Sequence, residues 1–170
     1  MTEENKQFIE LCQDSMKKMF KDFQHLHPIA FSLNSKMQLD VLPLFFLQSD
    51  NYVENLTTCL LHYIKKEKPN QIIFITEGSM VSYEGEKNTD AKIDRDYEKF
   101  GSIRNFPQSI EIISLILWTK QISFTRIWKI HETNNIKTLV FFEEKEETIG
   151  EEITKATNLK NPFINPTMYN

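Results

Sequence analysis

The sequence predicts an α+β domain, with a single, mainly antiparallel sheet of about five or six strands and helices packed on the sheet. Three observations predict this fold. Apolar residues recur at helical spacing near the N-terminus and again over 51–67. Alternating apolar and polar residues follow each of these two segments, as in strands. The links between successive strands are short, which favours antiparallel pairing, so the expected order is α-β-β-α-β-β-β-β.

Composition sets limits on the class of protein. A chain of 170 residues with 40% hydrophobic residues suits one globular domain, which we place at 1–143, followed by a charged and then Pro- and Asn-rich tail at 144–170. The net charge of −4 makes nucleic acid an unlikely partner. An acidic, polar N-terminus and the lack of a long apolar run predict a cytoplasmic protein with no membrane partner.

Two helices are expected. The first spans 3–24, with Thr2 as its N-cap, and it stops before Pro28, which disfavours helical geometry at the residue before it. The second spans 51–67, with Asn51 and Glu54 as a weak capping box. The apolar stripe of the first helix is predicted to be Phe8, Leu11, Cys12, Met19 and Phe23, with Ser15, and that of the second Val53, Leu56, Leu60, Tyr63 and Ile64.

A strand pair is predicted between these helices, at 29–33 and 37–43. A three-residue loop, Asn34-Ser35-Lys36, sets Leu33 opposite Met37 and Phe31 opposite Leu39. This register gathers the apolar residues on one face, whereas a slip of one residue would scramble both faces. Pro43 has no N–H to donate, so the second strand is expected to lie at an edge of the sheet or to end near Pro43.

The third strand, 71–83, carries Glu77 and Gly78 within an apolar pattern. Strict alternation places Glu77 on the same face as Ile73 and Ile75, where an unpaired carboxylate would be costly if buried. Three explanations are open. Gly78 marks a bulge that turns Glu77 outward, Glu77 pairs with Arg126, Arg104 or a lysine, or Glu77 works in a pocket.

The polar span 84–107 is long for a loop in a compact domain. Within it, Ile93, Tyr97 and Phe100 share one helical face, Asp90 is placed as an N-cap, and Gly101 follows the end. We expect a short helix here, with disorder as the alternative.

The strands at 109–119 and 122–132 form the best hairpin in the sequence. A turn centred on Lys120-Gln121 sets Leu117 opposite Phe124 and Ile113 opposite Trp128. One face is then the main core. The other face is also apolar, so a helix, the tail or another subunit has to cover part of it. We therefore predict an interface formed by Trp118, Ile116, Ile112, Ile127 and, from the tail, Phe163. A last strand is expected at 136–142.

Strand-end carboxylates are the candidates for catalysis. A strand that runs into Glu143-Glu144-Lys145 is similar to the Glu-x-Lys of many Mg²⁺-dependent nucleases, in which carboxylates hold the metal and the lysine assists the attacking water. Such a site also needs an acidic residue at an earlier strand end, and Glu77 and Glu111 are the candidates. If they converge with Glu143 and Lys145 in one cleft, the chain is a metal-dependent hydrolase.

Other ligand sets are weak in this sequence. The acidic residues between Glu84 and Glu98 are interleaved with lysine and arginine and lack the spacing of a Ca²⁺ loop. The four histidines and two cysteines show no His-x-x-x-His or Cys-x-x-Cys spacing, so we expect no metal and no cofactor, and two reduced thiols at Cys12 and Cys59.

Several of these features together carry a family resemblance. His27-Pro28, the strand pair after it, the second helix, and a strand that closes on Thr76-Glu77-Gly78-Ser79-Met80-Val81-Ser82 resemble a group of small bacterial α+β proteins with no assigned activity. The resemblance covers residues 8 to about 131 and implies no catalytic residues. The order of elements is similar to that of roadblock-like and profilin-like domains, which implies a dimerising or partner-binding module.

These observations favour a non-catalytic domain that binds another protein or associates with itself as a homodimer. The alternative is the metal-dependent hydrolase described above, and the arrangement of its carboxylates in space distinguishes the two.

Overall fold

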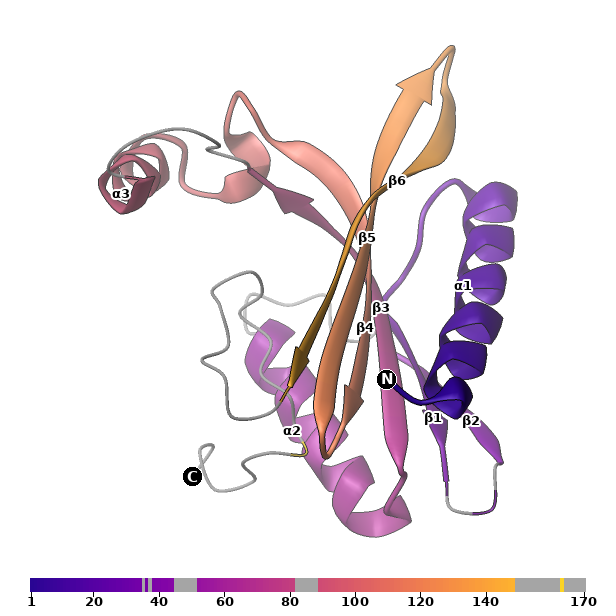
Figure 1. Ribbon diagram of the computed structural model, residues 1–170. Helices are drawn as coiled ribbons and strands as arrows, with labels where there is room; N and C mark the ends of the chain where they lie inside the picture. Colours follow the sequence, from indigo (N-terminus) through magenta and orange to yellow (C-terminus); the bar gives the residue numbers. More distant parts are fainter. Residues whose placement is uncertain (35, 37, 45–51, 82–88, 149–162, 164–170) are drawn as a thin grey trace.

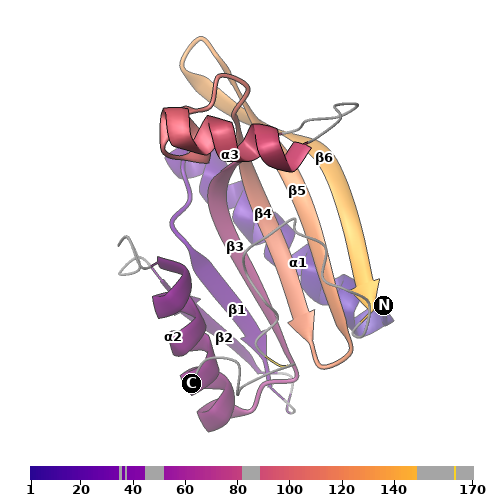
Figure 2. The ribbon, with the colours of Figure 1, turned by 90° about the vertical axis from the view of Figure 1, so that its left-hand side faces the viewer.

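The computed structural model describes residues 1–34, 36, 38–44, 52–81, 89–148 and 163. Within these residues, six strands form one antiparallel sheet in the order β2-β1-β3-β4-β5-β6 (Figures 1 and 2). The strands are β1 (Ile29–Leu33), β2 (Leu39–Pro43), β3 (Gln71–Met80), β4 (Ile110–Thr119), β5 (Ile122–Thr133) and β6 (Ile136–Thr148). The helices are α1 (Glu3–Phe23), α2 (Tyr52–Glu67) and α3 (Thr89–Phe100), with a short 3-10 helix η2 (Ile103–Asn105). The predicted α+β fold is confirmed.

Helix α1 covers one face of the sheet, which we call the α1 side, and α2 and α3 lie on the opposite face, the α2 side (Figures 1 and 2). The Thr2 hydroxyl accepts a hydrogen bond from the Asn5 N–H and caps α1 as predicted. The helix ends at Phe23 because Gln24 adopts a left-handed conformation with φ 60°.

The α1 side holds the larger core. Its buried residues come from α1, from the segment after it and from four strands: Phe8, Ile9, Cys12, Met16, Phe20, Leu26, Phe31, Leu33, Ile73, Ile75, Ile113, Leu115, Leu117, Ile122, Phe124 and Trp128. The predicted stripe on α1 is partly wrong. Leu11 is 52% exposed and Phe23 is 66% exposed, whereas Ile9, Met16 and Phe20 are buried in their place. The buried residues Phe8, Ile9, Cys12, Met16 and Phe20 recur at helical spacing and form one face, Leu11 lies outside this face, and Phe23 is the last residue of the helix.

The α2 side holds a smaller core of Ala30, Leu44, Leu56, Leu60, Ile72, Phe74, Ile116 and Trp118. Leu56 and Leu60 of α2 are buried, and Tyr63 and Ile64 pack against the cluster, as the stripe predicted. The predicted N-cap residue Asn51 and the side chain of Val53 lie outside the described residues. Phe74 and Trp118 stack with their ring centroids 6.0 Å apart.

The register of β1 and β2 corrects one prediction. Leu33 pairs with Leu39 and Phe31 pairs with Val41, so the pairing is shifted by two residues from the one expected. A longer turn causes the shift, because the Asn34 side chain accepts hydrogen bonds from the N–H groups of Lys36 and Gln38. A shift of two keeps the faces unchanged. Strand β2 is an edge strand that ends at Pro43, as predicted.

The β4–β5 hairpin has the predicted register, with Ile113 opposite Trp128 and Leu117 opposite Phe124. Strand β6 is longer than predicted and runs to Thr148, because β5 supplies a pairing partner for it along its whole length. Residues 143–148 therefore belong to the sheet and not to the tail.

The predicted short helix at 90–100 is α3, and Gly101 follows it with φ 78°. Asp90 lies inside this helix and is not its N-cap. Tyr97 and Phe100 pack their rings on Phe106, which is buried. In the part of the chain that the structure describes, no helix is long and apolar enough to span a membrane.

Candidate functional site

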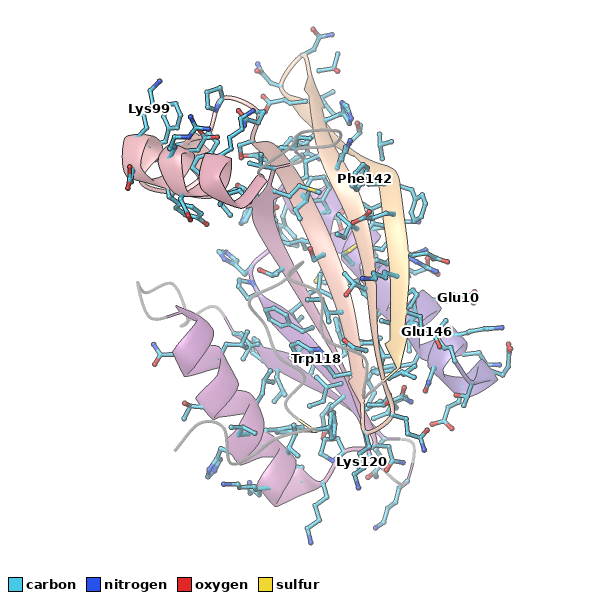
Figure 3. All side chains as sticks on the ribbon, turned by 60° about the vertical axis from the view of Figure 1, so that its left-hand side comes forward. Glu10, Lys99, Trp118, Lys120, Phe142 and Glu146 are labelled. Atoms are coloured by element: carbon cyan, nitrogen blue, oxygen red, sulfur yellow. The ribbon has the colours of Figure 1, made fainter. Side chains whose placement is uncertain are left out.

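Four of the five residues predicted as an interface are buried, and the fifth, Phe163, is partly buried. Trp118 and Ile116 are 1% and 2% exposed, and Ile112 and Ile127 are also buried. Phe163 packs against the cluster that contains Trp118, and Figure 3 shows Trp118 on the side that faces α2. The helix and the tail residue therefore provide the cover that this face was expected to need. That a partner binds at these residues stays a prediction.

The four residues proposed for catalysis do not share one site. Glu77 lies opposite Ile113, and Glu111 lies opposite Ser79, so both carboxylates are on the α1 side. Glu143 lies opposite Ile127 and Lys145 opposite Thr125, which places both on the α2 side. The convergence that a metal-dependent hydrolase requires is thus not formed by Glu77, Glu111 and Glu143. Among the residues that the structure describes, no three His, Cys, Asp or Glu side chains lie close enough to hold a metal ion.

Glu77 has a structural partner that none of the three explanations named. Its carboxylate Oε1 accepts a hydrogen bond of 2.7 Å from the backbone N–H of Leu26, which follows the end of α1. The pairing of β3 with β4 is unbroken from Gln71 to Met80, so the predicted bulge at Gly78 is wrong. Glu77 therefore stays on the α1 side and fixes the chain that leaves the helix, and this satisfies a backbone donor that would otherwise be unpaired.

Glu111 takes part in an ion-pair group at the same end of the sheet. Its carboxylate lies 3.4 Å from the Lys137 ammonium group and 3.9 Å from the Arg104 guanidinium. Exposed pairs of this kind contribute little to stability, and they compensate the charge of Glu111.

A partly buried group of hydrogen-bonded polar side chains on the α2 side could not be identified from the sequence pattern. The Tyr63 hydroxyl of α2 donates a hydrogen bond of 2.7 Å to the Asp40 carboxylate and lies 2.5 Å from the Ser32 hydroxyl. Ser32 and Asp40 are directly opposite each other on β1 and β2. Burial, with Asp40 adding to it, raises the pKa of Tyr63 to about 12. The group ties the edge strand β2 to α2, and the correct β1–β2 register would have revealed it.

Strand β6 forms the other edge of the sheet. Among the described residues, it carries three large apolar side chains that are exposed. Ile136, Val140 and Phe141 are 60%, 48% and 56% exposed. Val140 lies opposite Lys129 and Phe141 opposite Trp128, so Val140 faces the α2 side and Phe141 the α1 side. The β5–β6 hairpin also projects beyond the end of α1 (Figure 1). These residues were expected in a strand, but the sequence did not show that the strand lies at an edge.

Both ends of β6 are held by contacts with groups on the α1 side of the sheet. The Gln24 side chain, just after α1, accepts a hydrogen bond of 2.7 Å from the Lys137 N–H. Further along, Glu144 pairs with Arg126 at 2.8 Å, and Arg126 also donates to Gln13 of α1. Glu146 pairs with the N-terminal ammonium group at 2.9 Å. The central part of β6, 138–142, lies between these contacts, and Phe142 marks it in Figure 3.

A residue shift in the β5–β6 pairing occurs within this central part. Trp128 pairs with Phe141 and Ile127 pairs with Glu143, so Phe142 is an extra residue on β6. The Phe142 ring is covered by the Lys129 ammonium group, 3.9 Å from its centroid. The shift moves Glu143 to the α2 side and Glu144 to the α1 side.

Comparison of the chain with models of protein families, with curated protein sequences and with solved structures found no match. The resemblance to a group of small bacterial proteins therefore stays a prediction, and the candidate site is described from its own geometry.

Proposed function

We propose that this chain is a non-catalytic interaction domain that binds a protein partner, or a second copy of itself, along the outer edge of β6. The observation that carries the proposal is the exposure of Ile136, Val140 and Phe141 within six consecutive residues of one edge strand. An edge strand presents unpaired N–H and C=O groups, and proteins usually blunt such edges with charges, proline or cover.

A strand added to this edge would pair with its open backbone groups and cover its exposed apolar side chains. Thr133 and Ile136, which flank the two-residue turn, form a hydrogen-bonded pair, and hydrogen-bonded and non-hydrogen-bonded pairs alternate along the two strands from there. Leu139 and Phe141 therefore belong to non-hydrogen-bonded pairs, and their N–H and C=O groups point away from β5. A partner strand accepts and donates hydrogen bonds at these groups. Its side chains cover Val140 on one face and Phe141 on the other, which is the usual way in which an added strand gains affinity and specificity.

The interaction role agrees with what the similar element order of roadblock-like and profilin-like domains implies. We place the domain in the cytoplasm, since Cys12 and Cys59 are both free thiols and lie on helices at opposite faces of the sheet. Burial raises the pKa of Cys12 to about 12, which suits a structural thiol and not a reactive one.

The proposal is tested by photo-crosslinking in the cells that express the chain. A benzophenone analogue of phenylalanine replaces Phe141, and in a control it replaces Leu11 on α1, which is exposed to a similar degree, 52% against 56%. We expect a crosslinked adduct of defined mass from position 141 and not from position 11. No adduct from position 141, or equal and diffuse adducts from both positions, would contradict the proposed function.

A further inference from the structure

The edge of β6 is chemically asymmetric along its length. Lys137 lies near one end and is paired with Glu111, the apolar residues Leu139, Val140 and Phe141 lie in the middle, and the other end, 143–147, carries four glutamates and one lysine. A parallel second copy would place the two acidic ends side by side, and like charges directly opposite each other are destabilising. A second copy in antiparallel orientation keeps the two acidic ends apart.

We infer that the occupant of this edge is a second copy of the chain, related by a two-fold axis that passes beside Val140. This inference rests on the proposed function and specifies its partner. The two β6 strands pair antiparallel, so Val140 lies opposite Val140 of the second copy and Leu139 lies opposite Phe141. The two sheets then join into one, with both α1 helices on the same side.

The faces of the side chains agree with this register. Leu139 and Phe141 both face the α1 side, through their partners Ile130 and Trp128 on β5. Phe142 has no residue of β5 directly opposite it. If it is likewise unpaired with the second copy, Glu144 lies opposite Lys137 and Glu143 lies opposite Thr138. Lys137 and Glu144 both face the α1 side, because they lie opposite Glu132 and Arg126.

The length of the pairing is limited by the chain itself. The Gln24 side chain accepts the outward N–H of Lys137, so the backbone bonds to the second copy come from Leu139 and Phe141. A short pairing of this kind forms a reversible dimer whose population rises with concentration.

The register is tested with one cysteine on β6. In a Cys59→Ser background, in which Cys12 is buried, Val140→Cys places two thiols at the two-fold axis. Residues in a non-hydrogen-bonded antiparallel pair have Cα atoms about 4.5 Å apart, which is within reach of a disulfide. The control is Thr138→Cys, an exposed position on the same face that lies opposite Glu143 in the proposed register.

With oxidised glutathione, Val140→Cys is expected to form a covalent dimer roughly tenfold or more faster than Thr138→Cys, because the paired thiols have a high effective concentration. Circular dichroism checks that both variants are folded. Equal rates, or faster dimerisation of Thr138→Cys, would overturn the second copy in this register. A photo-crosslinked adduct from position 141 with a mass other than twice that of the chain would overturn the second copy while leaving the proposed function intact.

Discussion

The two edges of the sheet are built differently. Strand β2 has five residues, ends at Pro43 and turns the charged Asp40 inward, where Tyr63 of α2 binds it. Strand β6 has 13 residues, and its central part is apolar, with Val140 exposed on the α2 side and Phe141 exposed on the α1 side. Short length, proline and an inward-pointing charge are recognised ways of keeping an edge from pairing with other strands. The β2 edge therefore resists pairing, whereas the centre of β6 does not.

Exposure alone does not mark a binding edge. Val41 on β2 and Val140 on β6 are 49% and 48% exposed, so the two edges offer equivalent valines. They differ in the backbone around them and in the charges that flank them. This pair of residues is thus a matched test of which edge pairs.

The largest effect is expected when Val140 is replaced by Glu. Two carboxylates then meet at the two-fold axis, and juxtaposed like charges cost several kcal/mol, so association is weakened by at least about 100-fold. The new carboxylate also lies opposite Lys129 within its own chain, so the fold is preserved. Sedimentation velocity over a range of concentrations measures the change.

Val41→Glu is the matched control for this substitution. Because β2 does not pair with a second copy in our account, the variant is expected to associate as the wild type does. If Val41→Glu dissociates the dimer and Val140→Glu does not, the roles of the two edges are reversed.

An intermediate effect is expected at the β2 edge from Tyr63→Phe. The substitution leaves the Asp40 carboxylate and the buried Ser32 hydroxyl without the phenol, and such a loss costs about 1–3 kcal/mol of folding free energy. Urea unfolding measures it. Tyr97→Phe, at a 40% exposed position on α3, is the control and is expected to change stability by less than about 0.5 kcal/mol. Equal effects of the two substitutions would show that the polar group does not hold β2.

A smaller, pH-dependent effect has the same origin. Burial raises the pKa of Tyr63 to about 12 in the folded chain from its ordinary value of 10.0. The folded state holds this proton more tightly, so the stabilisation is complete below pH 10 and is lost as the pH rises toward 12. The difference in urea midpoint between wild type and Tyr63→Phe is therefore expected to shrink between pH 10 and pH 12. A constant difference over that window would contradict this assignment.

Much of the fold was predictable because side chains along a strand alternate strictly between the two faces of the sheet. The alternation in the β4–β5 hairpin, together with a two-residue turn, was enough to set Ile113 opposite Trp128. The β1–β2 register failed because the Asn34 side chain organises a longer turn, a local contact that alternation does not report. The faces were still correct, since the error was two residues.

The candidate site was less predictable because it depends on contacts between distant residues. Glu77 is explained by the N–H of Leu26, 51 positions away in the chain, and no pattern near Glu77 indicates that partner. Similarly, the segment 136–142 has the composition of any strand. Its importance comes from the sheet order, which leaves β6 at an edge.

Amide hydrogen exchange on β6, followed by NMR at increasing protein concentration, tests the central claim most directly. The amides of Leu139 and Phe141 point outward and are expected to exchange rapidly in dilute solution and slowly in concentrated solution, as the second copy accepts them. The Lys137 amide, bound by Gln24, provides an internal reference that is protected at every concentration. If the Leu139 and Phe141 amides exchange equally fast at all concentrations, β6 does not pair with a second copy.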